Sequence, residues 1–208
     1  MLFRSECCSK KKVLLESVSG HLESGKITAI MGPSGAGKTT LLDVLAGRKT
    51  SGFIRRGKLL INGANEPISK FSKEIGYVPQ EDTMYRSLTP RENLQYSAQL
   101  RLKASVTAKE RNNLVNEVLI MLDIYDKADD RIGDVEEKGL SGGQLKRVNI
   151  GMELVAKPSV LFLDEPTSGL DSSTSLIVLE ALQNIAHKGN VNVMAVVHQP
   201  RYEIFKQL

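Results

Sequence analysis

Two glycine-rich motifs that lie far apart in the chain constrain the fold more than any other feature of this sequence. The first has the form GxxxxGK[ST] and the second is LSGGQ: Gly32-Pro33-Ser34-Gly35-Ala36-Gly37-Lys38-Thr39 and Leu140-Ser141-Gly142-Gly143-Gln144. At background amino-acid frequencies the first occurs by chance in roughly one in a hundred chains of this length, and the second in roughly a few in ten thousand. An acidic pair, Asp164-Glu165, follows the second motif after about 20 residues. Together these features predict a protein that binds a nucleoside triphosphate.

The first motif lies between a predicted strand and a predicted helix. Residues 26–31 (KITAIM) are typical of a short buried strand, and residues 39–48 carry apolar side chains at helical spacing. Strand, glycine loop and helix in this order are the context that a phosphate loop requires. The loop glycines can turn successive N–H groups inward, where these would bind phosphate oxygens at the helix N-terminus. Lys38 would add a cation at the β and γ phosphates, and the Thr39 hydroxyl is placed to bind Mg²⁺.

The acidic pair Asp164-Glu165 follows a continuous apolar strand that is predicted at residues 160–163. An acid at the carboxyl end of such a strand lies where open α/β sheets bind ligands. Asp164 would hold Mg²⁺, directly or through water, and Glu165 would orient and polarise the attacking water as general base. Taken alone, an acidic pair at a strand end is usually a solvated turn, so this interpretation depends on the residues around it.

The composition describes an ordinary globular protein that can bury a core, with 41% hydrophobic and 25% charged residues among 208. The net charge of +4 comes from scattered basic residues, which argues against nucleic acid as a partner. Cys7 and Cys8 are adjacent and fit reduced thiols in a cytosolic protein better than a disulfide framework. The longest apolar runs are far below the roughly 18 residues needed to span a bilayer, so we expect this chain not to cross a membrane.

Elsewhere the pattern predicts alternating strands and helices. Further strands are expected at residues 58–61, 74–78 and 191–197, with a turn at Asn62-Gly63 after the first of them. The spacing of apolar residues predicts helical structure over residues 90–123 and 173–187.

The motifs resemble the nucleotide-binding domain of ATP-binding-cassette (ABC) proteins, and the resemblance covers nearly the whole chain. Residues 164–171 match the family pattern DEPTSGLD, which favours the catalytic interpretation of the acidic pair. The resemblance implies one domain over residues 1–208, with the end of the domain and a membrane domain beyond this sequence. The implied fold is α/β: a phosphate-loop NTPase core with a mainly parallel sheet flanked by helices, an antiparallel β part, and an inserted helical subdomain. That subdomain would span about residues 90–157 and carry the LSGGQ signature.

The resemblance also assigns roles to particular residues, with ATP and Mg²⁺ as cofactors. Gln80 matches the glutamine that reaches Mg²⁺ and the water while linking the core to the helical subdomain. His198 matches the switch histidine that contacts the γ-phosphate. The expected catalytic residues are Glu165, His198, Lys38 and Gln80, and the expected metal ligands are Thr39, Gln80 and Asp164. The expected nucleotide-binding residues are Gly32, Pro33, Ser34, Gly35, Ala36, Gly37, Lys38, Thr39, Thr40, Ser141, Gly142, Gly143, Gln144 and Asp171.

The LSGGQ motif is expected to begin a helix. Ser141 is a good N-cap, and the glycines after it permit close backbone approach, so the motif would make a second anion site at a helix N-terminus. In the family this signature closes over the ATP held by the phosphate loop of a second subunit, in a head-to-tail dimer. Asp171 would lie along that interface. The basic pair Lys146-Arg147 is interpreted as solvated.

The sequence assigns no residue to the nucleotide base. Many ABC domains stack adenine on an aromatic side chain upstream of the phosphate loop, but residues 10–25 contain no Phe, Tyr or Trp. The sequence therefore leaves GTP open as an alternative to ATP.

Four stretches, at residues 30–48, 141–155, 163–175 and 196–200, resemble the G subfamily of ABC transporters, the half-transporters of the white-brown-complex type. The resemblance implies ATP-driven transport of a lipid-like or other hydrophobic substrate, with this domain on the cytoplasmic face of a membrane. The implied partners are a second nucleotide-binding domain, in a homodimer or heterodimer, and a transmembrane domain on the same full-length polypeptide. A soluble ABC ATPase of translation or DNA maintenance is the alternative, although such proteins have two cassettes or a long coiled coil. Glu165 and His198 argue against a module that does not hydrolyse ATP.

Overall fold

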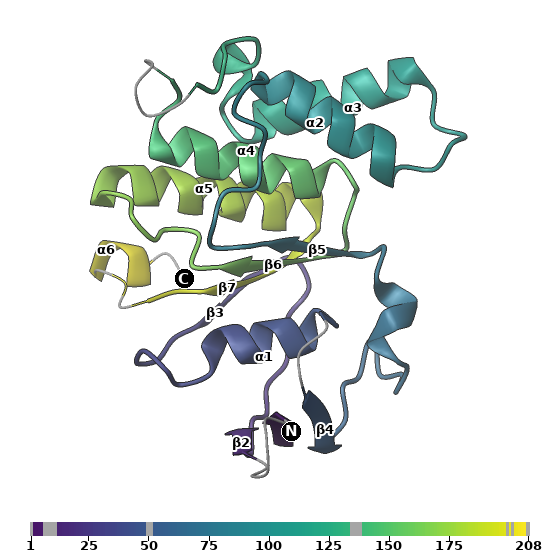
Figure 1. Cartoon of the computed structure of the whole chain (residues 1–208), viewed down its shortest axis with the longest axis vertical. Helices are drawn as coiled ribbons and strands as arrows, with labels where there is room; N and C mark the ends of the chain where they lie inside the picture. Colours follow the sequence, from purple (N-terminus) through teal and green to yellow (C-terminus); the bar gives the residue numbers. More distant parts are fainter. Residues whose placement is uncertain are drawn as a thin grey trace.

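The computed structural model describes residues 2–5, 12–48, 52–133, 139–198, 200 and 202–206. Its central sheet has four parallel strands in the order β3-β7-β6-β5. Their bounds are β3 Ile27–Ile30, β5 Ile75–Val78, β6 Val160–Asp164 and β7 Asn192–Val196 (Figure 1). Cys7, Cys8 and Gln199 lie outside the described residues, so the prediction that the two cysteines are reduced thiols stays a prediction.

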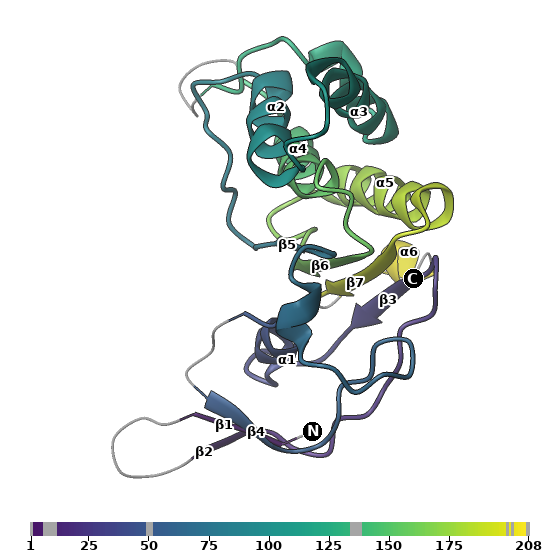
Figure 2. The ribbon, with the colours of Figure 1, turned by 90° about the vertical axis from the view of Figure 1, so that its right-hand side faces the viewer.

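Helices cover both faces of this sheet. On one face lies α1 (Lys38–Leu45), and on the other lie α4 (Gly142–Leu154) and α5 (Ser172–Gly189) (Figures 1 and 2). The two cores follow the alternation of side chains along a strand: Leu161 and Leu163 join the large core beside α4 and α5, whereas Phe162 joins the smaller core beside α1. β6 is therefore apolar on both faces, as its continuous hydrophobic sequence predicts.

A second sheet is antiparallel, and its strands come from both before and after the phosphate loop in the chain. It contains β1 (Leu2–Ser5), β2 (Lys12–Leu15) and β4 (Gly52–Arg56) in the order β2-β1-β4. The strand predicted at residues 58–61 is wrong, because residues 57–60 are described without regular structure. Ile61 makes only an isolated bridge with Ala64, closing the predicted turn, in which Asn62 and Gly63 both have positive φ.

In the described part of the chain, three α-helices lie between β5 and β6. They are α2 (Pro90–Arg101), α3 (Ala108–Met121) and α4, and α2 packs on both of the others. Each begins with a capping box, Thr89 with Glu92, Thr107 with Glu110 and Ser141 with Gln144, which satisfies N–H groups that a helix start leaves free. The helical pattern predicted over residues 90–123 is confirmed as two helices rather than one.

Most of the remaining predicted elements are confirmed with shifted ends. The helix predicted at residues 39–48 is α1, which ends at Leu45, and that predicted at 173–187 is α5. The strand predicted at residues 26–31 is β3, but its residues are half-buried rather than buried, because β3 ends the described strand order. Short helices complete the described chain: η1 (Ile68–Phe71), η2 (Tyr125–Lys127) and α6 (Tyr202–Phe205). Among the described residues, no helix combines the length and apolarity needed to cross a bilayer.

Candidate functional site

The phosphate loop connects the end of β3 to the start of α1, as predicted. Gly35 and Gly37 have φ angles of 77° and 88°, a region that other L-residues enter only at a cost. At Gly37 there is also little space, because a Cβ atom would lie 3.1 Å from Leu15 Cδ2 and 3.4 Å from the Leu14 carbonyl oxygen. The sharp turn of the loop and its contact with β2 therefore both require glycine at position 37.

The first turn of α1 presents backbone donors for which the described residues offer no acceptor. Its N-cap is Gly37, which has no side chain to accept from the helix, and the first helical N–H with a protein acceptor is that of Leu41. Within the described part of the chain, no hydrogen bond occupies the N–H groups of Lys38, Thr39 and Thr40. The side chain of Lys38 folds back over the loop, and its Nζ donates to the carbonyl oxygens of Gly32 and Pro33, at 3.0 Å each. Free N–H groups at a helix N-terminus beside a cation fit an anion such as a phosphate group.

The second element of the site joins α1 to the end of β6. Thr39 Oγ1 donates a hydrogen bond of 3.0 Å to Oδ1 of Asp164, which is only 6% exposed. Burial raises the pKa of Asp164 above its ordinary value, and the hydrogen bond from Thr39 partly opposes that effect. A hydroxyl and a buried carboxylate beside an anion cradle are the oxygen ligands that Mg²⁺ takes in combination with phosphates and water. The residues present therefore fit a bound Mg²⁺.

Glu165 follows Asp164 and has an unusual backbone conformation. Its φ angle is 48°, a left-handed conformation that is uncommon outside glycine and clusters at functional sites. The Glu165 N–H donates to the carbonyl oxygen of Val196 at 3.1 Å, which holds this turn against the end of β7. Its carboxylate Oε2 accepts a hydrogen bond of 3.2 Å from Gln80 Nε2, and the same amide lies 3.4 Å from Ser168 Oγ. The structure thus brings together Gln80 and Glu165, which are 85 positions apart.

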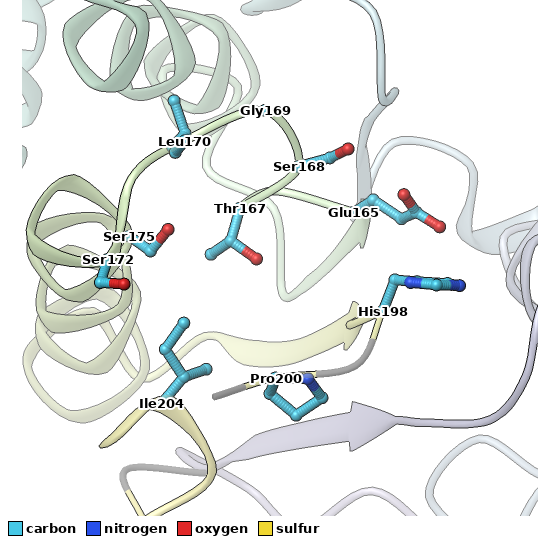
Figure 3. A pocket seen from close by; sticks show the side chains of 10 residues that line it. All are labelled: Glu165, Thr167, Ser168, Gly169, Leu170, Ser172, Ser175, His198, Pro200 and Ile204. Carbon is cyan, nitrogen blue, oxygen red and sulfur yellow. The ribbon is translucent and has the colours of Figure 1, made fainter. Parts of the chain in front are cut away.

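A cavity of about 260 Å³ opens beside Glu165 and His198. Figure 3 shows their two side chains on the same side of the cavity, both extending away from α5. The rest of its lining comes from residues 167–170, which follow β6, from the first turns of α5, and from Pro200 and Ile204. No residue of the phosphate loop lines it, so this cavity adjoins the proposed water-activating residues rather than the phosphate cradle.

The LSGGQ motif starts α4 as predicted. Ser141 Oγ accepts from the N–H of Gln144 at 3.4 Å, and Gln144 Oε1 accepts from the N–H of Ser141 at 2.8 Å. Ser141 and Gly142 are exposed, whereas Gly143 is buried so closely against α5 that a Cβ atom would lie 2.1 Å from Thr174 Cγ2. Helices α1 and α4 lie on opposite faces of the sheet (Figure 1). Among the described residues, no hydrogen bond joins the phosphate loop to this motif.

Asp171 is the N-cap of α5. Its carboxylate accepts from the N–H of Thr174 at 3.0 Å, from the Thr174 hydroxyl at 2.7 Å and from the hydroxyl of Ser173. These hydrogen bonds, that from Ser173 first, hold the pKa of Asp171 well below its ordinary value. The residue expected at a subunit interface therefore also fixes the start of its own helix.

The interpretation of Lys146-Arg147 as solvated is wrong, since both residues are buried. Lys146 Nζ donates to the Gln80 carbonyl oxygen at 2.8 Å, and Arg147 donates to the carbonyl oxygens of Leu122 and Asp123 at 2.9 and 2.7 Å. Residue type alone does not reveal such partners, because they come from segments distant in the sequence. The sequence did not predict a role for Asn149, which is also buried and accepts a hydrogen bond from Thr83, in the segment after Gln80. The available signal was its position three residues after Lys146, which puts both side chains on the same face of a helix.

A parallel sheet that leads through a glycine loop into a helix, with a buried acid beside the helix start, defines the phosphate-loop class of nucleotide-binding proteins. A family model described as "ABC transporter" matches residues 15–168. "ABC transporter G family member 28" of Arabidopsis thaliana is 49% identical over 197 residues, which are 95% of this chain and 18% of that protein. "Putative white-brown complex homolog protein 30" of the same plant is 47% identical with the same coverage. "Broad substrate specificity ATP-binding cassette transporter ABCG2" of Rattus norvegicus is 45% identical over 94% of this chain and 29% of its own length.

The chain belongs to the ABC transporter family, and the relatives named here include members of its G subfamily. The predicted resemblance is therefore confirmed. Domains of this family bind ATP and are ATPases coupled to transport. The chain spans less than a third of the length of these three relatives.

Proposed function

We propose that this chain binds and hydrolyses ATP and thereby powers an ABC half-transporter of the G subfamily. The observation that carries the proposal is the convergence of Thr39, Asp164, Glu165 and Gln80 beside three free N–H groups at the start of α1. These residues come from α1, from the end of β6 and from the segment after β5. They supply an anion cradle, metal ligands and a carboxylate base in one place.

The binding step uses α1 and its loop. The N–H groups of Lys38, Thr39 and Thr40 would donate to phosphate oxygens, and Lys38 Nζ would exchange its two loop carbonyls for the β and γ phosphates. Thr39 and Asp164 would hold Mg²⁺ with Gln80, exchanging their mutual hydrogen bond for metal contacts. When bound, Mg²⁺ would neutralise charge that develops on the phosphates.

The hydrolytic step uses the residues after β6 and β7. Glu165 would accept a proton from the attacking water, and its side chain lies on the same side of the cavity as that of His198 (Figure 3). Gln80 would orient Glu165 and the water through the amide that already contacts the carboxylate. His198, which is exposed at the end of β7, would donate to the γ-phosphate.

The LSGGQ motif supports a head-to-tail dimer. Ser141 and Gly142 are exposed at the start of α4, on the opposite face of the sheet from α1, so their own phosphate loop is not the site that they would contact. In the proposed dimer, Ser141, Gly142, Gly143 and Gln144 would close over ATP held by the second subunit, with Asp171 along the same interface. Helices α2, α3 and α4 would form the inserted subdomain, about residues 90–157, that moves the signature.

Transport itself is proposed from the relatives. Because they are transporters and this chain spans less than a third of their length, we propose a transmembrane domain on the same full-length polypeptide. The domain would lie on the cytoplasmic face and would power movement of a lipid-like or other hydrophobic substrate. Tyr85 is exposed in the segment between β5 and α2, and its side chain would be available for contact with that domain. The competing proposal, a soluble ABC ATPase, would be supported if the complete coding sequence contained no membrane-spanning segments.

The Glu165→Gln variant tests the proposed chemistry. It keeps the shape of the side chain and loses the base, so ATP affinity should stay within about twofold while hydrolysis falls at least about 100-fold. Gel filtration with Mg-ATP should show this variant as a dimer and Lys38→Ala, which loses the phosphate-binding cation, as a monomer. A Glu165→Gln protein that hydrolyses ATP at the parent rate would refute the assigned base.

The Ser141→Arg variant tests the dimer. A bulky cation at the exposed start of α4 should stop hydrolysis while leaving ATP binding by the variant's own phosphate loop unchanged. Equal loss of ATP affinity in the monomer would show that LSGGQ acts within one chain and would contradict the head-to-tail arrangement.

A further inference from the structure

Four consecutive residues after β5, residues 80–83, are each bonded to α4. Lys146 Nζ donates to the Gln80 carbonyl oxygen at 2.8 Å and forms an ion pair with Asp82 Oδ1 at 2.9 Å. Asn149 Nδ2 donates to the Glu81 carbonyl oxygen at 3.4 Å. Asn149 Oδ1 accepts from the Thr83 hydroxyl at 2.9 Å and from the Thr83 N–H at 3.4 Å. This part of the chain is therefore held by a helix that is distant in the sequence.

The two residues on α4 that make these bonds are deeply buried. The Lys146 side chain is 6% exposed, and Asn149 is 2% exposed. A buried ammonium group that loses its partners is strongly unfavourable, and an unsatisfied buried amide is also costly. Their bonds to residues 80–83 are therefore stronger constraints than surface contacts of the same length.

Gln80 is held from two sides. Its backbone carbonyl is fixed by Lys146, whereas its side chain reaches the other way to Glu165 Oε2 at 3.2 Å. Lys146 lies one helical turn after Gly142, which begins α4 within the LSGGQ motif. The helix that presents LSGGQ to a second molecule is thus the same helix that sets the position of Gln80.

We propose that Lys146 and Asn149 are positioning residues that fasten residues 80–83 to α4, so that Gln80 approaches Glu165 and the metal ligands only when α4 is correctly placed. The proposal rests on the proposed ATPase function for its consequence in catalysis. Any shift of α4 caused by a nucleotide held on a second subunit would then carry Gln80 with it, because the connection is made by partly buried polar bonds to α4 rather than by a flexible linker. Arg147, the adjacent buried cation, bonds instead to the end of α3 and takes no part in this connection.

The fastening itself is tested on the nucleotide-free 208-residue chain by hydrogen–deuterium exchange. Lys146→Met keeps an unbranched apolar side chain and removes the ammonium, so amides of residues 80–85 should exchange at least about tenfold faster while those of α1 are unchanged. Asn149→Leu, which keeps the branched shape of the side chain but can form no hydrogen bonds, should have the same effect. The matched control is Lys127→Met, which removes an exposed ion pair with Asp130 at 2.9 Å and should leave exchange at residues 80–85 unchanged.

The consequence for Gln80 is tested by ATP hydrolysis at varied Mg²⁺. In Lys146→Met the kcat should fall by about tenfold and the half-saturating Mg²⁺ should rise, while the nucleotide Kd stays within about twofold. Lys146→Arg, which can still donate to both partners, should recover most of the kcat. Adding Asp82→Asn to Lys146→Met removes the carboxylate that was left without its partner, and should recover the unfolding temperature but not the kcat.

Two outcomes would overturn the inference. Unchanged exchange at residues 80–85 in both Lys146→Met and Asn149→Leu would show that α4 does not fix this segment. Recovery of kcat together with thermal stability in the Lys146→Met/Asp82→Asn protein would show that Lys146 only balances the charge of Asp82. A parent chain that does not hydrolyse ATP would refute the proposed function instead, and the exchange result would still decide whether α4 fastens residues 80–83.

Discussion

The hydroxyl of Thr39 donates a hydrogen bond of 3.0 Å to Oδ1 of Asp164 and so joins residues that are 125 positions apart in the chain. Thr39 lies in the first turn of α1, and Asp164 is the last residue of β6. Between β3 and β6 lies β7, so the pair spans one intervening strand at the carboxyl edge of the sheet. This edge is where open parallel sheets bind ligands, because the loops after every strand meet there.

The Thr39–Asp164 pair predicts how binding depends on Mg²⁺. In Thr39→Val the shape is kept and the hydroxyl is lost, so ATP affinity without Mg²⁺ should be unchanged while the affinity gained on adding Mg²⁺ falls by about tenfold. Isothermal titration with and without Mg²⁺ measures both values. Thr28→Val, in β3, is the control and should behave as the parent. If Mg²⁺ raises the ATP affinity of Thr39→Val as much as that of the parent, Thr39 is not a metal ligand.

A substitution at Gly37 should damage both stability and nucleotide binding. Gly37→Ala places a Cβ atom at a φ of 88° and 3.1 Å from Leu15 Cδ2, so the free energy of unfolding should fall by about 1–2 kcal/mol. ATP binding should also be lost, since the loop cannot keep its turn. Gly20→Ala is the matched control: a Cβ there meets no described atom within 4 Å, and the change should be within about 0.5 kcal/mol. Denaturant unfolding and ATP titration distinguish the two variants.

The close contact between α4 and α5 predicts that one substitution lowers stability and that a second substitution restores it. In Gly143→Ala the new methyl group would overlap Thr174 Cγ2, so the helices must separate and the free energy of unfolding should fall by about 1–3 kcal/mol. Adding Thr174→Ser removes that methyl group and keeps the hydroxyl that donates to Asp171 Oδ2 at 2.7 Å. The double variant should therefore recover most of the loss in denaturant unfolding. No recovery in the double variant would mean that another contact limits the packing.

The Asp171 cap predicts a dependence of stability on pH. Because its pKa in the folded chain lies below the ordinary value of 3.8, the ionised carboxylate stabilises the fold above about pH 4, and this contribution is lost as the pH falls through the folded pKa. Asp171→Ala should lower the unfolding temperature at pH 7, and the difference from the parent should narrow below about pH 4. Thermal unfolding between pH 3 and pH 7 measures this. A difference of equal size at both ends would show that the charge contributes nothing.

The elements governed by local rules were predicted well. The phosphate loop and its flanking strand and helix follow from glycine, lysine and threonine at fixed spacing, and β6 from a run that is apolar at every position. Ser141 was predicted as an N-cap and is confirmed as one, because capping depends on residues only three positions apart. The strand placed at residues 58–61 failed because apolar residues there precede a tight turn that makes a single bridge. Propensity alone does not reveal whether a partner strand lies alongside.

The same division holds for the candidate site. The sequence by itself determined which residue types carry the chemistry and where the backbone needs glycine, since both depend on local spacing and on allowed φ angles. The tertiary structure alone decided that Thr39 meets Asp164, that Gln80 meets Glu165, and that Lys146 is buried against residues 80–83. Lys146 and Arg147 are neighbours in sequence but point about 100° apart around α4, so each meets a different segment of the chain. A residue's partner across the fold depends on how distant elements pack, and a local pattern contains no record of that packing.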